Sequence, residues 1–238
     1  ESPKFDKNEP WKGNVYGDPR PPVCWSFSWD EVNTGAQQWN EWSVADIQYA
    51  INTSNLIVMF NGKHDVAYLR REGVDFSKAK VWDVQIAEFL ISRQRNKFPS
   101  LNDTCVRLGL PVKLDVVKTE YFDKGIDTCD ILWDVLCEYA ALDASLTLRC
   151  YYSQIKEMPP AMQKLCRLMS QDMLVLQEME KNGITYDGEL CAAKEIELDN
   201  EILEIQKELA AIYPTIPLNF SSGDQLSAFL YGGTIYED

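Results

Sequence analysis

The sequence is poor in the residues and motifs of several common active sites. It contains one histidine, His64, among 238 residues, which excludes any site that needs two histidines. It has no G-x-G-x-x-G and no G-x-x-x-x-G-K-[ST] segment, so it carries neither a dinucleotide-binding fingerprint nor a P-loop. No G-x-S-x-G elbow accompanies His64, which leaves a Ser-His-Asp mechanism unsupported. The metal chemistry that remains is that of Mg²⁺ or Mn²⁺ held by carboxylates.

Long apolar runs and paired cysteines are also missing. The longest strongly apolar run, Leu56–Phe60, is far shorter than the roughly 20 residues of a membrane helix. The sequence does not start with a basic stretch followed by an apolar one, so we expect no secretory signal peptide. The seven cysteines include no C-x-x-C pair, which disfavours zinc and redox motifs and fits thiols in a reducing compartment. We therefore expect a cytoplasmic protein that does not contact a membrane.

The net charge of −14 alone argues against a surface that binds phosphates. However, residues 171–208 hold eleven of the 37 acids and only three of the 23 bases, so one span contributes −8 of this charge. Several bases lie close together in residues 70–97. Global charge therefore leaves nucleic-acid binding open.

The pattern of strands and helices predicts two parts. Residues 1–22 contain five prolines and two glycines, which favours an extended or looped segment. Strand-like runs then alternate with helical ones, whereas only helical patterns follow Pro159 and Pro160. We predict an α/β domain over residues 1–157 and an all-α segment over 158–238 that continues into something larger.

The individual elements follow from apolar periodicity and from turn residues. Leu56–Phe60 is apolar at every position and predicts a buried strand in the middle of a sheet. A strand at 23–29 is expected to pair with one at 37–43, and Ser43 is expected to be the N-cap of the helix that follows. Further helices are expected at 44–52, 64–72, 101–108, 131–156, 161–181 and 188–212, with a short strand and a helix within 80–92.

Asp65 is the first candidate functional residue. It follows the buried strand directly, at the start of a helix, and an open α/β sheet places its binding crevice at the carboxyl ends of its strands. A carboxylate at this place can bind a metal, but it can equally be an ordinary first-turn acid that the helix dipole stabilises. Position alone leaves both interpretations open.

Tyr139 and Asp143 form the second candidate site. They are four residues apart and so share one face of the predicted helix 131–156. That face is its apolar stripe, where an acid must be paired with a base such as Arg149 or bound to a metal. Glu1 is by itself an ordinary terminal residue.

Short segments in register along the chain resemble the 3′–5′ exonuclease domain of family A DNA polymerases and the start of their polymerase portion. Asn61-x-x-x-Asp65 is similar to the second exonuclease motif, and Tyr139-x-x-x-Asp143, within CEYAALDASLTLRCYY, to the third motif in its tyrosine form. Val81–Leu90 and SLNDTCVRLGL resemble the segments between these two motifs. MLVLQEMEKNGITYDGEL and LNFSSGDQLSAFLYGG resemble the start of the polymerase portion. The segment K-G-N-x-Y-x-D-P-R is most similar to phage-type members.

The resemblance implies a ribonuclease-H-like (DnaQ-like) fold with a mixed central sheet, and proofreading of the single-stranded 3′ end of DNA. It implies two divalent ions, Mg²⁺ or Mn²⁺, with Glu1, Asp65 and Asp143 as ligands and Tyr139 as a further catalytic residue. Asn61 and His64 are the implied substrate-binding residues. The remainder of the polymerase is the implied partner, and a bacterial cytoplasm, or that of a phage's bacterial host, the implied location.

One family motif is incomplete in this sequence. The first motif is D-x-E on the first strand, and Glu1 matches its glutamate, with the aspartate expected two residues earlier. Residues 4–22 are then the loop to the second strand. Two alternatives remain: an inactive exonuclease-like module that serves a structural or DNA-binding role, and an RNA-processing exonuclease of the same superfamily. The polymerase-like segments after residue 158 argue against the second alternative.

Overall fold

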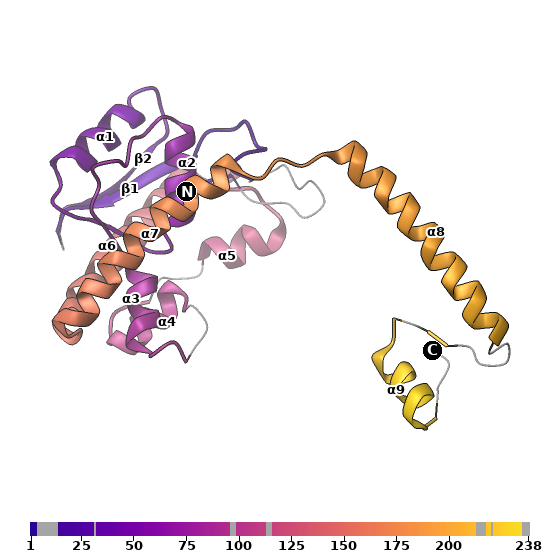
Figure 1. Cartoon of the computed structure of the whole chain (residues 1–238). Helices are drawn as coiled ribbons and strands as arrows, with labels where there is room; N and C mark the ends of the chain where they lie inside the picture. The colour runs from indigo at the N-terminus through magenta and orange to yellow at the C-terminus, as the bar shows by residue number, and fades with distance from the viewer. Residues whose placement is uncertain are drawn as a thin grey trace. The chain divides into compact units, whose positions relative to one another are not determined.

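The computed structural model describes residues 1–3, 14–30, 32–95, 99–112, 116–212, 218–219 and 221–234. It divides into two compact units, Glu1–Gly183 and Ile184–Asp238. The first unit contains the strands and most of the helices (Figure 1). Most of the loop expected at residues 4–22 falls at 4–13, outside the described residues. In the described parts of the chain, no helix combines the length and apolarity needed to cross a membrane.

The strands of the first unit form two separate pairs. β1 (Cys24–Ser28) and β2 (Thr34–Gln38) are antiparallel, and β3 (Ile57–Met59) and β4 (Val81–Asp83) are parallel, with Met59 opposite Asp83. The expected mixed central sheet is therefore wrong for the described residues, because no ladder joins the pairs. β3 is also half-buried rather than buried as expected, since it pairs only with β4.

The helices of the first unit match the expected ones closely, apart from α5, which was not expected. They are α1 (Ser43–Thr53), α2 (Lys63–Arg71), α3 (Val84–Ile91), α4 (Leu101–Leu108), α5 (Val116–Glu120), α6 (Trp133–Glu157) and α7 (Pro160–Asn182), with short 3₁₀ turns η1 (Phe122–Lys124) and η2 (Thr128–Asp130). The N-cap prediction for Ser43 is wrong. Ser43 is the first helical residue, and its hydroxyl accepts the Asn40 N–H at 2.9 Å instead.

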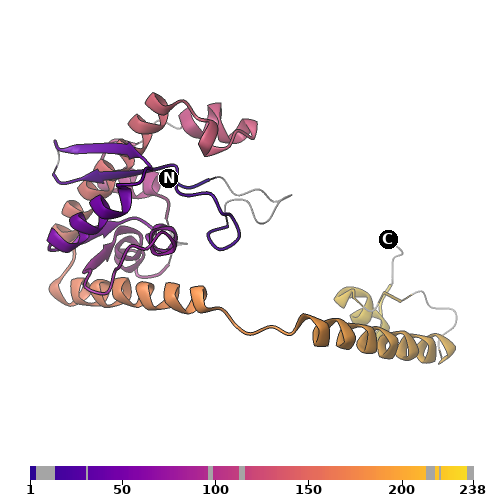
Figure 2. The same cartoon turned by 90° about the horizontal axis from the view of Figure 1, so that it is seen from above.

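Three apolar clusters hold these elements together. One joins β4, α3, α4 and α6 around the fully buried Trp82, Leu146 and Cys150. The second joins α1, α2 and β4 to α7 through Met173 and Leu174, and the third packs α6 against β1 and α5. In Figures 1 and 2, α6 lies against the β1–β2 hairpin.

Helix α7 belongs to the first unit, so the compact boundary falls at Gly183 rather than at residue 157. Its buried side contacts β4, α2 and α3. The helix ends at Asn182, one residue beyond the expected end at 181. Gly183 follows with a positive φ of 65°, and its N–H bonds to the Met179 carbonyl at 3.0 Å. The division of domains at 157/158 stays a prediction about family organisation.

The second unit contains α8 (Gly188–Ile212) and α9 (Gly223–Tyr231). Neither helix has a buried residue. The apolar residues of α8 are exposed, including Leu198, Ile202 and Ile205. Within the second unit, the described residues therefore leave these apolar side chains of α8 uncovered.

Candidate functional site

Asn61 and Asp65 lie where β3 passes into α2, as the sequence predicts. Asn61 has a φ of 51°, a left-handed conformation that Asn tolerates better than most residues. Gly62 follows as the N-cap of α2 without a side-chain cap of its own, and Asp65 is the third helical residue. Both polar side chains belong to exposed residues. This turn therefore presents an amide and a carboxylate at the carboxyl end of a strand.

The environment of Asp65 disfavours its charged form. Desolvation by the surrounding protein raises the pKa of Asp65 to about 7, and the charges of Glu1 and Asp83 add to the rise, while the α-amino group opposes it. Asp65 still exposes more than a third of its surface, and water there screens these effects. A cation bound nearby would favour the ionised carboxylate.

Glu1 and Ser2 join β1 to the first turn of α2. The Glu1 carbonyl accepts the Val23 N–H at 2.9 Å, and the α-amino group donates to the Cys24 carbonyl at 2.8 Å. The Ser2 hydroxyl lies 3.0 Å from Nε2 of His64. The structure thus brings Glu1, His64 and Asp65 into one neighbourhood.

His64 has an environment that favours its neutral form. Desolvation lowers the pKa of His64, the positive α-amino group adds to this effect, and Glu1 opposes it. The ring also makes an edge contact with Tyr68, with 5.0 Å between the ring centroids. A neutral imidazole beside a carboxylate can bind a substrate hydroxyl or base by hydrogen bonding.

Tyr139 and Asp143 lie on α6, four residues apart and both half-buried. Tyr139 packs with the third apolar cluster, which surrounds Cys24 and Leu136. Helix α6 is fixed to the hairpin next to this site, because the Thr34 hydroxyl donates to the Ala141 carbonyl at 3.0 Å. The prediction that Asp143 lies within metal-bridging range of Asp65 stays a prediction.

The donor chemistry of this neighbourhood fits a hard divalent cation, because Glu1 and Asp65 interact and both supply carboxylate oxygens. Among the described residues, however, no group of three or more His, Cys, Asp or Glu is placed to hold a metal ion. The implied set of Glu1, Asp65 and Asp143 is therefore not gathered as one cluster. Like charges repel, so bringing a third carboxylate to the other two requires a cation.

A buried carboxylate that the motifs did not single out lies behind the turn. Asp83 is 1% exposed, and its two oxygens accept backbone N–H groups of Gly62, Gln85 and Ile86. Desolvation raises the pKa of Asp83, and these N–H groups together with that of Asn61 oppose the rise. An aspartate just before a helical run is an N-cap signal, so the sequence could have shown the cap on α3 but not the bond to Gly62.

A cavity of about 400 Å³ opens beside the same turn. Its polar lining includes Asn61, Lys63 and Gln85, and α7 supplies much of its apolar side. Lys63 pairs with Glu180 at 2.7 Å, which ties the first residue of α2 to the end of α7. The turn is thus supported from α7 as well as from β4.

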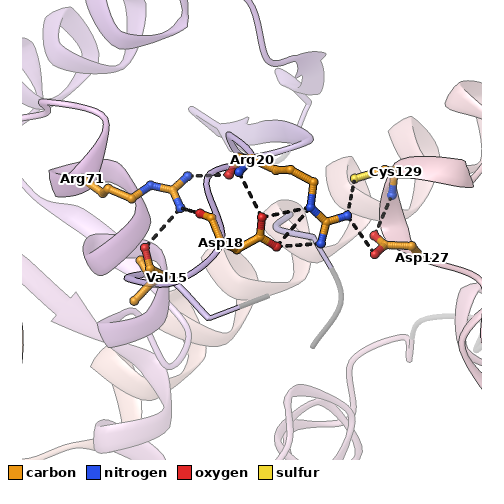
Figure 3. A network of polar contacts seen from close by, with 6 residues as sticks. All are labelled: Val15, Asp18, Arg20, Arg71, Asp127 and Cys129. Carbon is orange, nitrogen blue, oxygen red and sulfur yellow. Dashed lines mark hydrogen bonds and ion pairs between the residues drawn. The ribbon is translucent and has the colours of Figure 1, made fainter. Parts of the chain in front are cut away.

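A charged network holds residues 14–22 against the other end of α2 (Figure 3). Asp18, whose side chain is fully buried, pairs with Arg20 at 2.6 Å, and Arg20 also reaches Asp127 at 3.1 Å. Arg71, the last residue of α2, donates to the carbonyls of Val15, Asp18 and Arg20. This network, which the sequence did not predict, fixes the segment with the D-P-R motif onto the helix that carries Asp65.

Comparison with known families identifies the class of this arrangement. The family model of a 3′–5′ exonuclease matches residues 30–158, more than half of the chain. The chain therefore belongs to the 3′–5′ exonuclease domain family of family A DNA polymerases. This membership implies a ribonuclease-H-like fold and nuclease activity, in a family that generally uses divalent metals. A comparison with curated proteins finds no match.

Five of the candidate residues fall within the matched range. These are Asn61, His64, Asp65, Tyr139 and Asp143, whereas Glu1 precedes it. The match stops near the end of α6, so it does not test the resemblance of later segments to a polymerase.

Proposed function

We propose that the chain is the proofreading part of a family A DNA polymerase, which removes mispaired nucleotides from a single-stranded 3′ end as 5′-mononucleotides. The observation that carries the proposal is the family match over a range that contains the strand-to-helix turn with Asn61 and Asp65. The partners are the 3′ end of DNA and the rest of the polymerase. The similarity of the D-P-R segment points to a phage-type enzyme in the cytoplasm of a bacterial host.

The reaction assigns a role to each candidate residue. Two Mg²⁺ or Mn²⁺ ions held by Glu1, Asp65 and Asp143 would activate the attacking water and stabilise the leaving 3′ oxygen. Tyr139 orients this water through its hydroxyl, since an ordinary tyrosine pKa of about 10 suits a hydrogen-bond partner better than a base. Asn61 and His64 bind the terminal nucleotide. Stacking and backbone contacts suffice for substrate binding because proofreading requires no base readout.

A catalytically inactive exonuclease-like module is the second candidate function. The observation in its favour is that no three-carboxylate metal group is assembled among the described residues. Such a module would bind DNA or support a neighbouring domain without hydrolysing the strand. The two candidates differ in whether restoring the complete first motif creates activity.

The experiment compares two N-terminal extensions of the full chain. One version places an aspartate two residues before Glu1, which restores D-x-E, and the other places an asparagine there. Release of mononucleotides from a labelled single strand is measured with Mg²⁺ and with Mn²⁺. We expect the aspartate version to be at least about 100-fold faster, because a lost carboxylate ligand weakens both ions. Equal rates would refute the assignment of Glu1, and no release from either version would favour the inactive module.

A further inference from the structure

The carboxylate of Asp83 connects the starts of two helices. Its Oδ1 accepts the N–H groups of Gln85 and Ile86 at 2.8 and 3.0 Å, which caps α3. Its Oδ2 accepts the N–H of Gly62 at 2.7 Å, across 21 residues of sequence. Gly62 is the N-cap of α2 and has no side chain with which to cap that helix. Asp83 thus supplies to α2 a hydrogen-bond acceptor that the local sequence lacks.

We propose that Asp83 is a positioning residue, which holds the Asn61–Gly62 turn and thereby aligns Asn61 and Asp65 for the nuclease reaction. The proposal rests on the proposed function for its catalytic consequence. Asp83 acts through the backbone of Gly62 and is not itself assigned any contact with substrate or metal.

The turn has an unusual backbone conformation, which contacts from other residues must stabilise. Asn61 lies in the left-handed region, with a φ of 51°. A Cβ atom at Gly62 would lie 2.7 Å from both Cβ and Sδ of Met59, so the chain passes Met59 too closely for any larger residue. Met59 is in turn the register partner of Asp83 in the parallel ladder. The ladder places Asp83 next to the turn, and its carboxylate then fixes the N–H of Gly62, the N-cap of α2.

Asp83 is itself held from α7. Its N–H donates to the hydroxyl of Ser170 at 3.0 Å, and that hydroxyl donates to the Cys166 carbonyl at 2.8 Å. Ser170 and Cys166 are fully buried. The position of the turn therefore depends on a chain of buried contacts from α7 through β4 to Gly62. Such a chain fixes geometry rather than merely filling space.

Two substitutions separate the two functions of the carboxylate. In Asp83→Asn the amide oxygen can accept from the α3 amides, but the amide nitrogen cannot accept the Gly62 N–H. In Asp83→Ser the hydroxyl can still cap α3 but is too short to bond Gly62 at the same time. The matched control is Ser100→Ala, which removes the N-cap of α4 and its bond from the Asp103 N–H, within the same unit.

Two readouts on the full chain with the restored D-x-E test the proposal. The first is hydrogen exchange of the Gly62 amide without substrate, and the second is kcat and KM on single-stranded DNA. We expect both Asp83 variants to speed Gly62 exchange about tenfold or more, because the bond that protects it is lost. We expect kcat to fall roughly 10- to 100-fold with KM within about threefold, as for a misaligned reacting group. Ser100→Ala should leave Gly62 exchange unchanged and kcat within about twofold, since its cap lies on another helix.

The outcomes distinguish this proposal from the proposed function. Unchanged Gly62 exchange in Asp83→Asn would overturn the positioning role whether or not the chain is a nuclease. Faster exchange with a kcat equal to that of Ser100→Ala would show that the turn tolerates the loss, which also overturns it. If the starting protein releases no nucleotides, the proposed function fails, and the exchange result alone decides whether Asp83 holds the turn.

Discussion

Asp65 is an exposed carboxylate whose pKa is nevertheless raised. Its pKa lies near 7 in the folded chain, against 3.8 for an ordinary aspartate, so folding favours the protonated form. The contribution of protonated Asp65 to the free energy of unfolding is fully present at low pH, and it is lost as the pH rises from about 4 through about 7. Because the side chain is exposed, water screens its interactions, and this contribution to the free energy of unfolding is only about 1 kcal/mol.

We therefore expect Asp65→Asn to gain stability relative to the parent chain as the pH rises. Asparagine cannot ionise, so the variant escapes the loss that the carboxylate suffers. The difference in the free energy of unfolding should grow by about 1 kcal/mol between pH 5 and pH 8 in EDTA, measured by urea unfolding. Asp123→Asn, which changes an exposed acid of η1, is the matched control. A difference that is the same at both pH values would contradict the unfavourable environment of Asp65.

Tyr139 should affect catalysis rather than binding. Four residues advance a helix by about 400°, so Tyr139 and Asp143 nearly stack on one side of α6. In the active form with the restored D-x-E, Tyr139→Phe should slow nucleotide release roughly tenfold through loss of water orientation. The Kd for single-stranded DNA should stay within about twofold, because the ring remains.

Tyr152→Phe, on the exposed side of the same helix, is the control for this experiment and should leave the rate unchanged. An unchanged rate in Tyr139→Phe would remove the orienting role. If Tyr139→Phe weakened DNA binding as much as it slowed nucleotide release, Tyr139 would contact the substrate rather than orient the water.

The sequence predicts residues well where their signal is local and poorly where it is not. The position of Asp65 at a strand-to-helix turn could be predicted because an apolar run and a helix start flank it within a few residues. The bond from Gly62 to Asp83 could not be found, because it depends on which strands pair. The buried Glu88 is a similar case. Its partners, Arg107 and Gln154, lie on two other helices.

At the scale of elements, helix ends with strong caps were predicted almost exactly. Ser100 forms a capping box with Asp103, and Gly109 ends α4 with a φ of 68°, so both ends are set by adjacent residues. The sheet was predicted less well, because strand pairing is non-local. The apolar stripe expected on helix 131–156 is also only partly right. Leu142 of α6 is exposed, while the small and polar residues Ala140, Thr147 and Gln154 are buried.

The network around Arg20 should be the most sensitive contact between residues 14–22 and the rest of the first unit. Arg20→Ala removes the guanidinium that pairs with the buried carboxylate of Asp18, and breaking a fully buried ion pair costs several kcal/mol. Because Arg20 is about one-third exposed, we expect a loss of about 2 kcal/mol in thermal or urea unfolding.

The matched control for Arg20 is Lys124→Ala. It breaks the exposed pair with Glu120, which should cost less than about 0.5 kcal/mol. If the two substitutions cost the same, the network in Figure 3 would be a surface pair of no special importance.

At the scale of the whole molecule, two helices of equal length offer a direct comparison. α6 and α8 each have 25 residues, but α6 has buried residues along its length and α8 has none. Isolated helices are marginal in water, so α8 depends on packing that the described residues of the second unit do not provide. We expect α8 amides to exchange at least about 100-fold faster than those of α6 in a monomeric sample. Equal protection would show that residues 188–212 are well packed and are not an arm of a larger body.

The central claim is that this chain is a 3′–5′ exonuclease module, and digestion of an end-labelled strand tests it most directly. A single-stranded DNA labelled at its 5′ end is incubated with Mg²⁺ or Mn²⁺ and the version of the chain that carries the complete first motif. The account predicts a ladder that shortens one nucleotide at a time from the 3′ end, with loss of activity in EDTA, in Asp65→Asn and in Asp143→Asn. Absence of shortening, or shortening that persists in Asp65→Asn, would contradict it.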